Sequence, residues 1–572
     1  MLKHFKKNWM LIVAGAALYW LALPPMKCPW AAYLSMACWV PIVANKTAPT
    51  KKEYWHLWLI GLLMWLGILQ GIRLGNWALY FGWAALSMYV AAYLPLYVFL
   101  ARFLRHTTKL PLSMACTVAW VVGEWIRAHF ATGFTAGILA HSQTPWPWIL
   151  QIAAHFGSYG VGFFVVLGGT LIYECSVLIT SCRIVGAPIA APNRKQSLRC
   201  ALLAAIVIGM GLSAASSLNE YDRMILEKGP IKPLARILLI QENIPISFIK
   251  VMKNLQDGWL RYEQQTSIAA KKAGPLGVDL VVWPEATFSG GTPWLDWDKS
   301  PEVPPDLLGD SEKFKKATQA LEQTMSSKLR HLFSLFVTTK PQFILGTDLL
   351  KIRSGVTSAS NAALWARTEN PSDSSYYAKQ HLVMFGEYIP IVSRIPFLLK
   401  WLNFGKYEAG TEPVTWQLPN GVKISPSICF ENFLPHLIQA HVRKLTDKGQ
   451  SPEILVNITN DAWFKGSSML DHHVNSAILT AVENRRPMLV AGNQGISAWI
   501  DGNGRVVQSL APLASDSILA EPIGDGRWGL WQVVGDTPAM CLTILCAIAL
   551  LYNFIRRSKS SARHPNGRDC VQ

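Results

Sequence analysis

The sequence predicts a bundle of membrane-spanning α-helices joined to an α/β domain, and three observations lead to this prediction. Of the 572 residues, 51% are hydrophobic and only 16% are charged, against about 25% charged in a typical soluble domain. The hydrophobic residues gather in eight long runs, and the mean hydropathy is +0.22. Between the last two runs, about 300 residues instead alternate short apolar strands with polar helices. This composition excludes a disordered chain, which needs low hydrophobicity and high charge.

Each of the eight runs is long enough to cross a bilayer, which takes roughly 20 residues of helix. The runs lie near residues 8–25, 28–45, 55–72, 76–101, 110–127, 159–181, 200–217 and 537–555. The first run follows three lysines, as the apolar part of a signal peptide would, but no A-x-A-like cleavage site comes after it. We therefore expect this run to be retained as the first span.

Lysine and arginine predict the orientation of the spans, because cytoplasmic loops carry more of both. With a cytoplasmic N-terminus, the inner segments hold eighteen Lys and Arg residues against only Glu53 and Asp569. These segments are 1–7, 46–53, 102–109, 183–199 and 556–572. The net charge of +17 therefore belongs almost entirely to the inner face. It does not indicate a basic domain surface of the kind that binds nucleic acid.

This orientation divides the chain into three parts. Residues 1–217 are predicted to form a seven-span transmembrane domain, and residues 218–536 an extracytoplasmic domain. Residues 537–572 would form the eighth span and a basic cytoplasmic tail. Both termini are then cytoplasmic, and the middle part is large enough to bury a core of its own.

The middle part has the pattern of an α/β domain, in which strands alternate with helices. The predicted strands are 235–241, 278–283, 342–346, 362–366, 422–429, 454–458, 488–491 and 496–500. The predicted helices are 250–273, 311–332, 433–447 and 469–485. A stretch rich in Pro and Gly, 289–310, is expected to be an inserted loop.

Cysteine use singles out one residue. Of the ten cysteines, nine lie in or beside the predicted spans or in the tail, and only Cys429 lies in the extracytoplasmic domain. An oxidising compartment favours disulfides, but Cys429 has no second cysteine in its domain to pair with. By itself it is as easily a small buried apolar residue as a nucleophile.

Polar residues follow several of the predicted strands directly. Glu285 follows 278–283, Glu431 follows Cys429 at the end of 422–429, and Asp461 follows 454–458. Lys379 and Glu387 flank another short apolar run. Active sites of α/β domains assemble where strand ends meet at one edge of the sheet, so these residues are candidates for a site.

These motifs resemble the nitrilase superfamily, whose catalytic set is Glu, Lys and Cys in that order along the chain. Together with the membrane spans, they resemble the bacterial apolipoprotein N-acyltransferases in particular. The motifs that carry the resemblance are QENIP (241–245), WPEA (283–286), KQHLVMFGEYIP (379–390), ICFEN (428–432) and NDAWF (460–464). In the membrane part they are GEWIRAHFATGF (123–134), AHSQ (140–143) and GSYGVGF (157–163). The resemblance implies an αββα sandwich for the extracytoplasmic domain.

The resemblance also implies roles for individual residues. Cys429 would be the nucleophile, Glu285 the general base and Lys379 the stabiliser of the tetrahedral oxyanion. These roles are consistent with the chemistry of thiols. A thiol with a pKa of about 8.5 is mostly protonated at neutral pH, so it needs a base to become a nucleophile. Glu387, Glu431 and Phe430 would be accessory residues that shape the site. The chain departs from the family pattern at Lys250, Met384, Phe430 and Lys465.

The implied reaction is acyl transfer in two steps at the periplasmic face of the bacterial inner membrane. Cys429 would take an acyl chain from a phospholipid, expected to be phosphatidylethanolamine. The α-amino group of a diacylglyceryl-cysteine at a lipoprotein N-terminus would then accept that chain from the thioester. The resemblance implies no cofactor and no metal for this chemistry.

Three other patterns carry less weight. Asp471, His472 and His473 have no further ligand at a zinc-site spacing. Residues 524–529 match G-x-G-x-x-G but precede a membrane span instead of opening a βαβ helix. Glu124 and Glu174 fall within predicted spans, where a carboxylate is a candidate for function.

Three alternative functions remain open at this point. A membrane-tethered amidase would use the same three residues on a small soluble substrate. A related acyltransferase would act on another protein amine. A transporter with a large outer domain would need polar groups lining the bundle and would not need Cys429.

Overall fold

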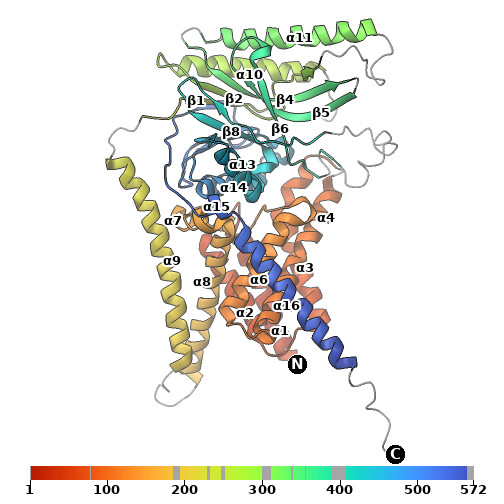
Figure 1. Ribbon diagram of the computed structural model, residues 1–572. Helices are drawn as coiled ribbons and strands as arrows, with labels where there is room; N and C mark the ends of the chain where they lie inside the picture. The colour runs from red at the N-terminus through yellow and green to blue at the C-terminus, as the bar shows by residue number, and fades with distance from the viewer. Residues whose placement is uncertain are drawn as a thin grey trace, which may run out of the picture.

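The computed structural model shows a helical bundle with an α/β part stacked on one of its ends (Figure 1). The structure describes residues 2–77, 79–184, 194–227, 232–245, 252–298, 311–336, 339–354, 356–384, 387–388 and 407–562. Lys250 and residues 299–310 of the expected loop lie outside the described residues.

Helices occupy all eight of the predicted apolar runs. They are α1 (Leu2–Ala22), α2 (Pro29–Ala44), α3 (Lys51–Ile68), α4 (Leu79–Ala91) with α5 (Tyr93–Arg102), α6 (Leu112–His129), α8 (Ala153–Ile184), α9 (Arg194–Glu227) and α16 (Thr537–Ala562). Within the described part of the chain, four stretches are long and apolar enough to cross a membrane: Leu79–Thr107, Ala153–Thr180, Ser197–Ile225 and Thr537–Lys559. The count of eight spans therefore stays a prediction, while several helices are candidates for membrane spans.

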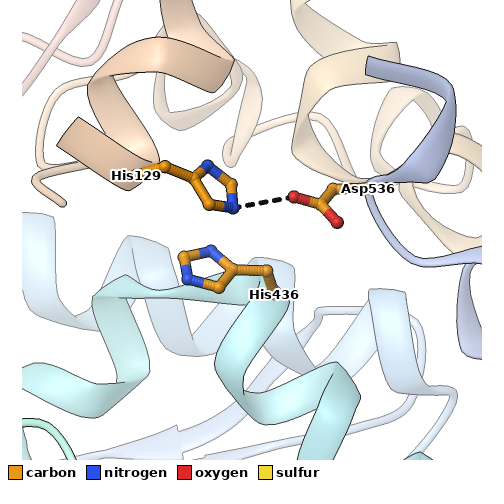
Figure 2. Close-up of side chains that lie close together, drawn as sticks. All are labelled: His129, His436 and Asp536. Atoms are coloured by element: carbon orange, nitrogen blue, oxygen red, sulfur yellow. Dashed lines mark ion pairs between the residues drawn. The ribbon is translucent and has the colours of Figure 1, made fainter. Parts of the chain in front are cut away.

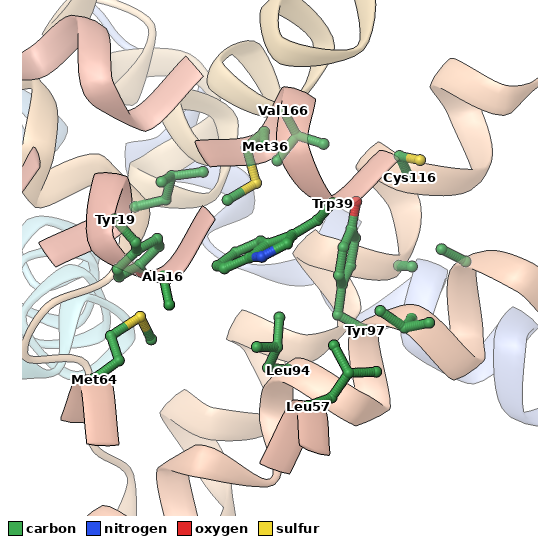
Figure 3. Packing of buried hydrophobic residues seen from close by; sticks show 14 of the residues in the cluster. Ala16, Tyr19, Met36, Trp39, Leu57, Met64, Leu94, Tyr97, Cys116 and Val166 are labelled. Atoms are coloured by element: carbon green, nitrogen blue, oxygen red, sulfur yellow. The ribbon is translucent and has the colours of Figure 1, made fainter. Parts of the chain in front are cut away.

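Aromatic side chains form much of the bundle core. Trp39 of α2 lies in the middle of the cluster that Figure 3 shows, and its ring stacks on Tyr19 of α1 at a centroid distance of 6.0 Å. Trp120 of α6 packs against the other side of this group, 6.3 Å from Trp39. Such pairs join three helices with little polar surface, as a helix bundle in an apolar surrounding requires.

Two of the long helices leave most of their surface uncovered. α9 slants away from the bundle and α16 runs across it, and both expose apolar side chains along their length (Figure 1). Leu202 and Leu212 of α9 are more than 60% exposed, as is Leu545 of α16. A water-soluble chain would rarely leave such long apolar surfaces open, so these faces are suited to contact lipid.

The α/β part contains two sheets. The first sheet has the order β13-β1-β2-β4-β5-β6, with β3 paired to β4, and the second has the order β12-β11-β10-β9-β8-β7. The first sheet comprises β1 (Ile237–Gln241), β2 (Leu280–Trp283), β3 (Trp294–Trp297), β4 (Gln342–Arg353), β5 (Val356–Ala366), β6 (Ser375–Ala378) and β13 (Asp516–Ala520). The second comprises β7 (Trp416–Gln417), β8 (Lys423–Ile428), β9 (Ile454–Asn460), β10 (Met488–Asn493), β11 (Ala498–Ile500) and β12 (Val506–Ser509).

The sheets and helices form four layers. Alternate side chains of β1, β2, β8 and β9 make a shared core between the two sheets, since Ile237, Val282 and Ile424 are fully buried there. Helices α10 (Met252–Lys272) and α11 (Ser311–Ser334) cover the other face of the first sheet. Helices α13 (Pro435–Asp447) and α14 (Met469–Asn484) cover the second sheet on the side of the bundle. This is the αββα arrangement that the resemblance implies.

The strands predicted from apolar runs are all present, and five further strands were missed. These are β3, β6, β7, β12 and β13, which are short or carry mixed polar residues. The expectation that 289–310 is entirely a loop is wrong, because Trp294–Trp297 forms β3. Trp294 and Leu295 are buried and pair in register with Leu349 and Leu350 of β4, which outweighs the surrounding Pro and Gly.

Polar contacts join the bundle to the α/β part. Glu124 of α6 accepts a hydrogen bond from Leu139 N at 2.9 Å, which fixes the turn that runs on to Thr144. Thr144 in turn bonds Asn475 of α14 at 3.0 Å. At the end of α9, Asp222 forms a two-bonded ion pair with Arg505. The site described next therefore sits on a base fixed to the membrane helices.

Candidate active site

The candidate residues meet where parallel strands of the two sheets end. In the first sheet β2 lies parallel to β4, and Glu285 follows β2 by two residues. In the second sheet β8 lies parallel to β9, with Ile428 opposite Ile458. Cys429 therefore leaves the sheet beside the end of β9, which is the edge where α/β sites form.

Glu285 is 7% exposed and bonded at both carboxylate oxygens. Oε2 accepts from Asn460 N of the second sheet at 2.9 Å, and Oε1 accepts from Asn361 Nδ2 at 2.6 Å. The backbone at Pro284 and Glu285 passes so close to Gly346 of β4 that any Cβ there would collide with it. Glu285 is thus held in one orientation, and it bridges the two sheets.

Lys379 directly follows β6 and is only 1% exposed. Its Nζ contacts Glu387 Oε1 at 2.9 Å and Glu285 Oε1 at 3.3 Å. Burial alone would lower the pKa of Lys379, but the two carboxylates outweigh burial and hold the pKa above its ordinary value. The side chain is therefore a fixed positive charge that does not exchange its proton near neutral pH.

Asn361 of β5 organises these charges and was not among the predicted residues. It lies beside Lys379, whose backbone N–H donates to Asn361 O at 2.8 Å. Its side-chain amide donates to Glu285 Oε1 at 2.6 Å and to Glu387 Oε1 at 2.9 Å. A polar residue at the start of the predicted strand 362–366 was the available signal, but the partners lie 76 and 26 positions away.

Glu387 belongs to the same cluster. Its Oε1 accepts hydrogen bonds from Lys379 Nζ and Asn361 Nδ2, and its Oε2 accepts from Val383 N at 2.8 Å. The cluster thus contains two carboxylates and one ammonium group, all of them hydrogen-bonded. Burying charges is tolerable only when they are paired in this way.

Cys429 begins a short 3₁₀ helix, Cys429–Phe433, with a φ of 50°. A non-glycine residue is strained in this left-handed region, and such strain is typical of functional positions. Burial raises the pKa of the Cys429 thiol, and the negative charge of Glu285 raises it further, while Lys379 opposes the shift. The resting thiol is therefore protonated, and its reaction requires a base.

His473 and Asp461 stabilise the backbone of the strained residue. Asp461 was a candidate because it follows a predicted strand, whereas His473 was not predicted for this site. His473 Nε2 lies 3.1 Å from Cys429 O, and a carbonyl oxygen can only accept, so Nε2 carries a hydrogen. His473 Nδ1 lies 2.9 Å from Asp461 Oδ1. Burial alone would lower the pKa of His473, but Asp461 outweighs burial and raises it. The raised pKa favours the protonated ring, which can donate to Cys429 O and to Asp461 at the same time.

Glu431 connects the cysteine loop to the strand that carries Lys379. It is fully buried, and one oxygen accepts from Tyr377 Oη at 2.8 Å and from Gln380 N at 2.7 Å. Its other oxygen accepts from Ile428 N at 2.7 Å. Burial raises the pKa of Glu431, and these donors oppose that shift. Glu431 therefore fixes the spacing between the residues before Cys429 and those after Lys379.

Phe430 points away from this polar cluster. It packs against the bundle core, and its ring stacks on His381 at 5.9 Å. It also contacts Phe433 at 5.5 Å. Phe430 therefore lies between the cysteine loop and the membrane helices, where an apolar side chain is stable.

The other sequence candidates do not converge on this site as a metal centre. Asp471 pairs with Lys27 at 2.6 Å, while His473 faces Asp461 and His472 is buried separately. Among the described residues, one group of three His or acidic side chains brings its ligand atoms together, and it lies elsewhere, at His129, His436 and Asp536.

Comparison with known proteins agrees with this geometry. The model of the apolipoprotein N-acyltransferase N-terminal domain matches residues 15–171, and the carbon-nitrogen hydrolase model matches residues 239–529. An apolipoprotein N-acyltransferase of Rhodopirellula baltica is 30% identical over 566 residues, which cover 94% of this chain and 95% of the relative. The chain belongs to the apolipoprotein N-acyltransferase family. A second relative of that name, from Geobacter metallireducens, is 26% identical over 97% of this chain and 96% of its own length.

Membership in this family settles the coarse features of the chain. It is an acyltransferase of the membrane, and its α/β part has the nitrilase-like fold of the carbon-nitrogen hydrolases. The transporter alternative is therefore excluded as the main function.

Proposed function

We propose that the protein transfers an acyl chain from a phospholipid to the α-amino group of a diacylglyceryl-cysteine at a lipoprotein N-terminus. The observation that carries this proposal is the convergence of buried Glu285 and Lys379 on the strained Cys429 at the junction of the two sheets. The relatives that match almost the full chain are named apolipoprotein N-acyltransferases, which supports an amine of an apolipoprotein as the acceptor.

In the first half of the reaction, Glu285 takes the proton from the Cys429 thiol as the sulfur attacks the acyl ester carbonyl. A C–S bond forms, and negative charge develops on the carbonyl oxygen, where Lys379 stabilises it. The ester C–O bond then breaks, and the proton held by Glu285 passes to the leaving oxygen. The products are a Cys429 thioester and a lysophospholipid, and we expect the donor to be phosphatidylethanolamine.

In the second half, the neutral amine of the acceptor attacks the thioester carbonyl. A C–N bond forms, Glu285 accepts a proton from the nitrogen, and Lys379 again faces the oxyanion. The C–S bond breaks, and the proton returns to sulfur, which restores the Cys429 thiol. Splitting the transfer into two steps lets a single site serve two membrane-anchored substrates in turn.

Glu387, Glu431 and Phe430 act through these residues as positioning groups in this proposal. Glu387 neutralises part of the charge of Lys379 and holds it in line with Glu285. Glu431 ties the residue before Cys429 to the segment after Lys379. Phe430 anchors the same loop to the membrane helices.

The proposal includes the membrane arrangement. Residues 1–217 would supply seven spans, residues 218–536 the catalytic domain on the periplasmic side of the inner membrane, and residues 537–572 the last span and tail. Both termini would be cytoplasmic. The start of α1 and the end of α16 lie at the end of the bundle remote from the α/β part, which supports this orientation (Figure 1).

The test follows an acyl chain through both halves of the reaction. Full-length protein in detergent receives phosphatidylethanolamine labelled in an acyl chain, without acceptor, and label on the protein is checked for release by hydroxylamine. A diacylated lipopeptide is then added. We expect label on the wild type and on Cys541→Ala, a control at an exposed cysteine of α16, but not on Cys429→Ala.

Three results would contradict parts of the proposal. Label on Cys429→Ala would remove Cys429 as the nucleophile. No label on folded wild type, together with ammonia release from a short amide, would favour the tethered amidase. Label that forms but is not transferred to the lipopeptide would favour an acyltransferase acting on a different protein amine.

A further inference from the structure

We propose that His129, His436 and Asp536 form a binding site for one divalent transition-metal ion, with Zn²⁺ as its representative. The site is separate from the catalytic cluster and lies between the bundle and the α/β part (Figure 2). The proposal does not depend on which acyl donor or acceptor the enzyme uses.

The three side chains come from distant segments and converge. His129 ends α6, His436 is the second residue of α13, and Asp536 lies one residue before α16. One ligand atom from each lies within 4.8 Å of the others, and His129 Nε2 is 2.9 Å from Asp536 Oδ2. Figure 2 shows His129 facing the Asp536 carboxylate, with the ring of His436 stacked beside that of His129.

Two of the ligands already have the outer hydrogen bonds that metal ligands need. His129 Nδ1 lies 2.9 Å from the carbonyl oxygen of Trp125, so Nδ1 carries the hydrogen. This leaves Nε2 as the nitrogen that can offer a lone pair to a metal. The Trp125 indole N–H also donates to Asp536 Oδ2 at 2.9 Å. Bonds of this kind fix the orientation of metal-ligating His and carboxylate side chains.

The third ligand has an unused nitrogen. His436 Nδ1 is buried and has no hydrogen-bond partner, and one ring nitrogen of His436 belongs to the group of ligand atoms. A buried polar atom without a partner is costly, at about 1–3 kcal/mol. Coordination to a metal would satisfy it.

The donor set selects a class of ion. Two imidazoles and one carboxylate suit Zn²⁺ and neighbouring transition metals, whereas Mg²⁺ and Ca²⁺ prefer oxygen ligands alone. Three protein ligands leave one position of a tetrahedral ion open. The rings of His129 and His436 stack at 4.2 Å with 26° between their planes, so His436 must turn about its Cβ–Cγ bond on binding.

A bound ion would cross-link three parts of the chain. It would tie the end of α6 to the start of α13 and to the segment that enters α16. Helix α13 follows the loop of Cys429 and Glu431, so the bound ion would stabilise the segment next to the active site without contacting substrate. The expected effect of the metal is therefore on stability and not on the chemical step.

The experiment measures metal binding to the full-length protein directly. The protein in detergent is stripped with a chelator, its thiols are capped with N-ethylmaleimide, and Zn²⁺ is titrated against a competing dye. We expect one equivalent to bind, and His436→Gln and Asp536→Asn to weaken binding at least tenfold. His331→Gln, at a half-exposed histidine of α11 that pairs with Glu263, is the matched control and should bind as wild type does.

Two further measurements keep the test decisive if a ligand variant folds poorly. Trp125→Phe retains all three ligands but loses the indole bond to Asp536, so its Zn²⁺ affinity should fall by about 10–100-fold. Zn²⁺ should also raise the Tm of wild type, because a ligand that binds only the folded state stabilises it, but not that of His436→Gln. Equal Zn²⁺ affinity in wild type, His436→Gln and Trp125→Phe would overturn the proposal and leave the group as an ion pair with a stacked ring.

Discussion

The two sheets contribute to the candidate active site in different ways. On the side of the first sheet, Glu285, Lys379 and Glu387 form a cluster of paired charges arranged by Asn361. On the side of the second sheet, buried side chains form hydrogen bonds with the backbone around Cys429. The ring of His473 donates to the carbonyl oxygen of Cys429. Glu431 holds the preceding N–H.

This difference separates two requirements of the reaction. In the proposed reaction, charge is needed where the thiol loses its proton and where the oxyanion forms, and the first sheet has paired charges in a buried setting that strengthens them. The nucleophile must also be presented at a fixed angle, and a strained φ of 50° needs bonds that hold it. Variants on the first side should therefore change the chemical step, and variants on the second side should change geometry and stability.

The largest effect on rate is expected from Glu285→Gln. Gln keeps the size of the side chain and can accept from Asn460 N, but it cannot take a proton from Cys429. Thioester formation should slow by about 10²–10⁴-fold, as for loss of a general base. The measurement is single-turnover labelling of the enzyme, with circular dichroism as the control for folding. A rate within threefold of wild type would remove Glu285 from its proposed role.

The next largest effect is expected from Lys379→Met. Met fills a similar volume without the charge, so about 10²–10³-fold should be lost in both half-reactions. The double variant Lys379→Met with Glu387→Gln separates the effect on rate from the effect on stability. In Lys379→Met the buried carboxylate of Glu387 has lost its cation, and Glu387→Gln removes that unpaired carboxylate. The double variant should regain Tm but not rate, and recovery of rate would contradict the assignment of charge to the first sheet.

A smaller effect is expected at His473, where two substitutions divide its two hydrogen bonds. His473→Gln keeps a donor near Nε2 for Cys429 O, whereas His473→Asn keeps one near Nδ1 for Asp461. Loss of a buried partner costs about 1–3 kcal/mol, so we expect His473→Asn to lower kcat about tenfold with little change in KM. His473→Gln should retain more activity, and the reverse order would mean that Asp461, not the cysteine carbonyl, is the important contact.

His473 also predicts a dependence of stability on pH. Because Asp461 raises the pKa of His473 in the folded state, its contribution to stability is complete below the ordinary value of 6.5. That contribution is lost as pH rises through the folded-state pKa. Thermal unfolding of His473→Asn should therefore depend less on alkaline pH than unfolding of the wild type does.

The smallest effect on rate is expected from Glu483→Gln in the same helix α14. Glu483 is fully buried, accepts from Ser158 N at 2.7 Å through one oxygen, and has no partner for the other. Burial raises its pKa from 4.5 to about 8, so the folded state holds an extra proton between these values. The wild type should lose about 1.4 kcal/mol of stability per pH unit over this range.

Gln removes that loss, because its carbonyl still accepts from Ser158 and it carries no titrating proton. Glu483→Gln should therefore be more stable than wild type at pH 8 and similar at pH 4.5, with unchanged acyl transfer. Urea unfolding of the tryptophan-rich protein, followed by fluorescence at both pH values, measures the difference. A variant less stable than wild type at pH 8 would mean that Glu483 is ionised and paired in the folded state.

How far the fold could be predicted depends on whether a signal is local. The strands with continuous apolar runs, such as Ile454–Asn460, were predicted because consecutive apolar residues indicate a buried strand. β6, with the sequence SYYA, was missed because only half of it is buried and its partner is supplied by β5. β3 was missed because Pro and Gly around it indicate a loop, while its pairing with β4 depends on residues more than 50 positions away.

The same distinction applies to the site. Glu285 follows a predicted strand and Cys429 ends one, which made them candidates, whereas Lys379 follows β6, a strand that was missed, and was selected through the resemblance. Asn361 and His473 act through partners 76 and 44 positions away, and no spacing in the sequence marks them. His129, His436 and Asp536 are separated more widely still, which is why only the folded chain brings them to notice.

The bond from Trp125 to Asp536 joins residues 411 positions apart and has a consequence for biosynthesis. At roughly 5–20 residues per second, the ribosome needs about 20–80 s to make the chain between them. During that time the end of α6 lacks this hydrogen-bond partner, while the whole α/β part is synthesised. A chain released before residue 536 would contain every residue of the candidate active site. It would still lack the hydrogen bond that joins the end of α6 to the segment before α16.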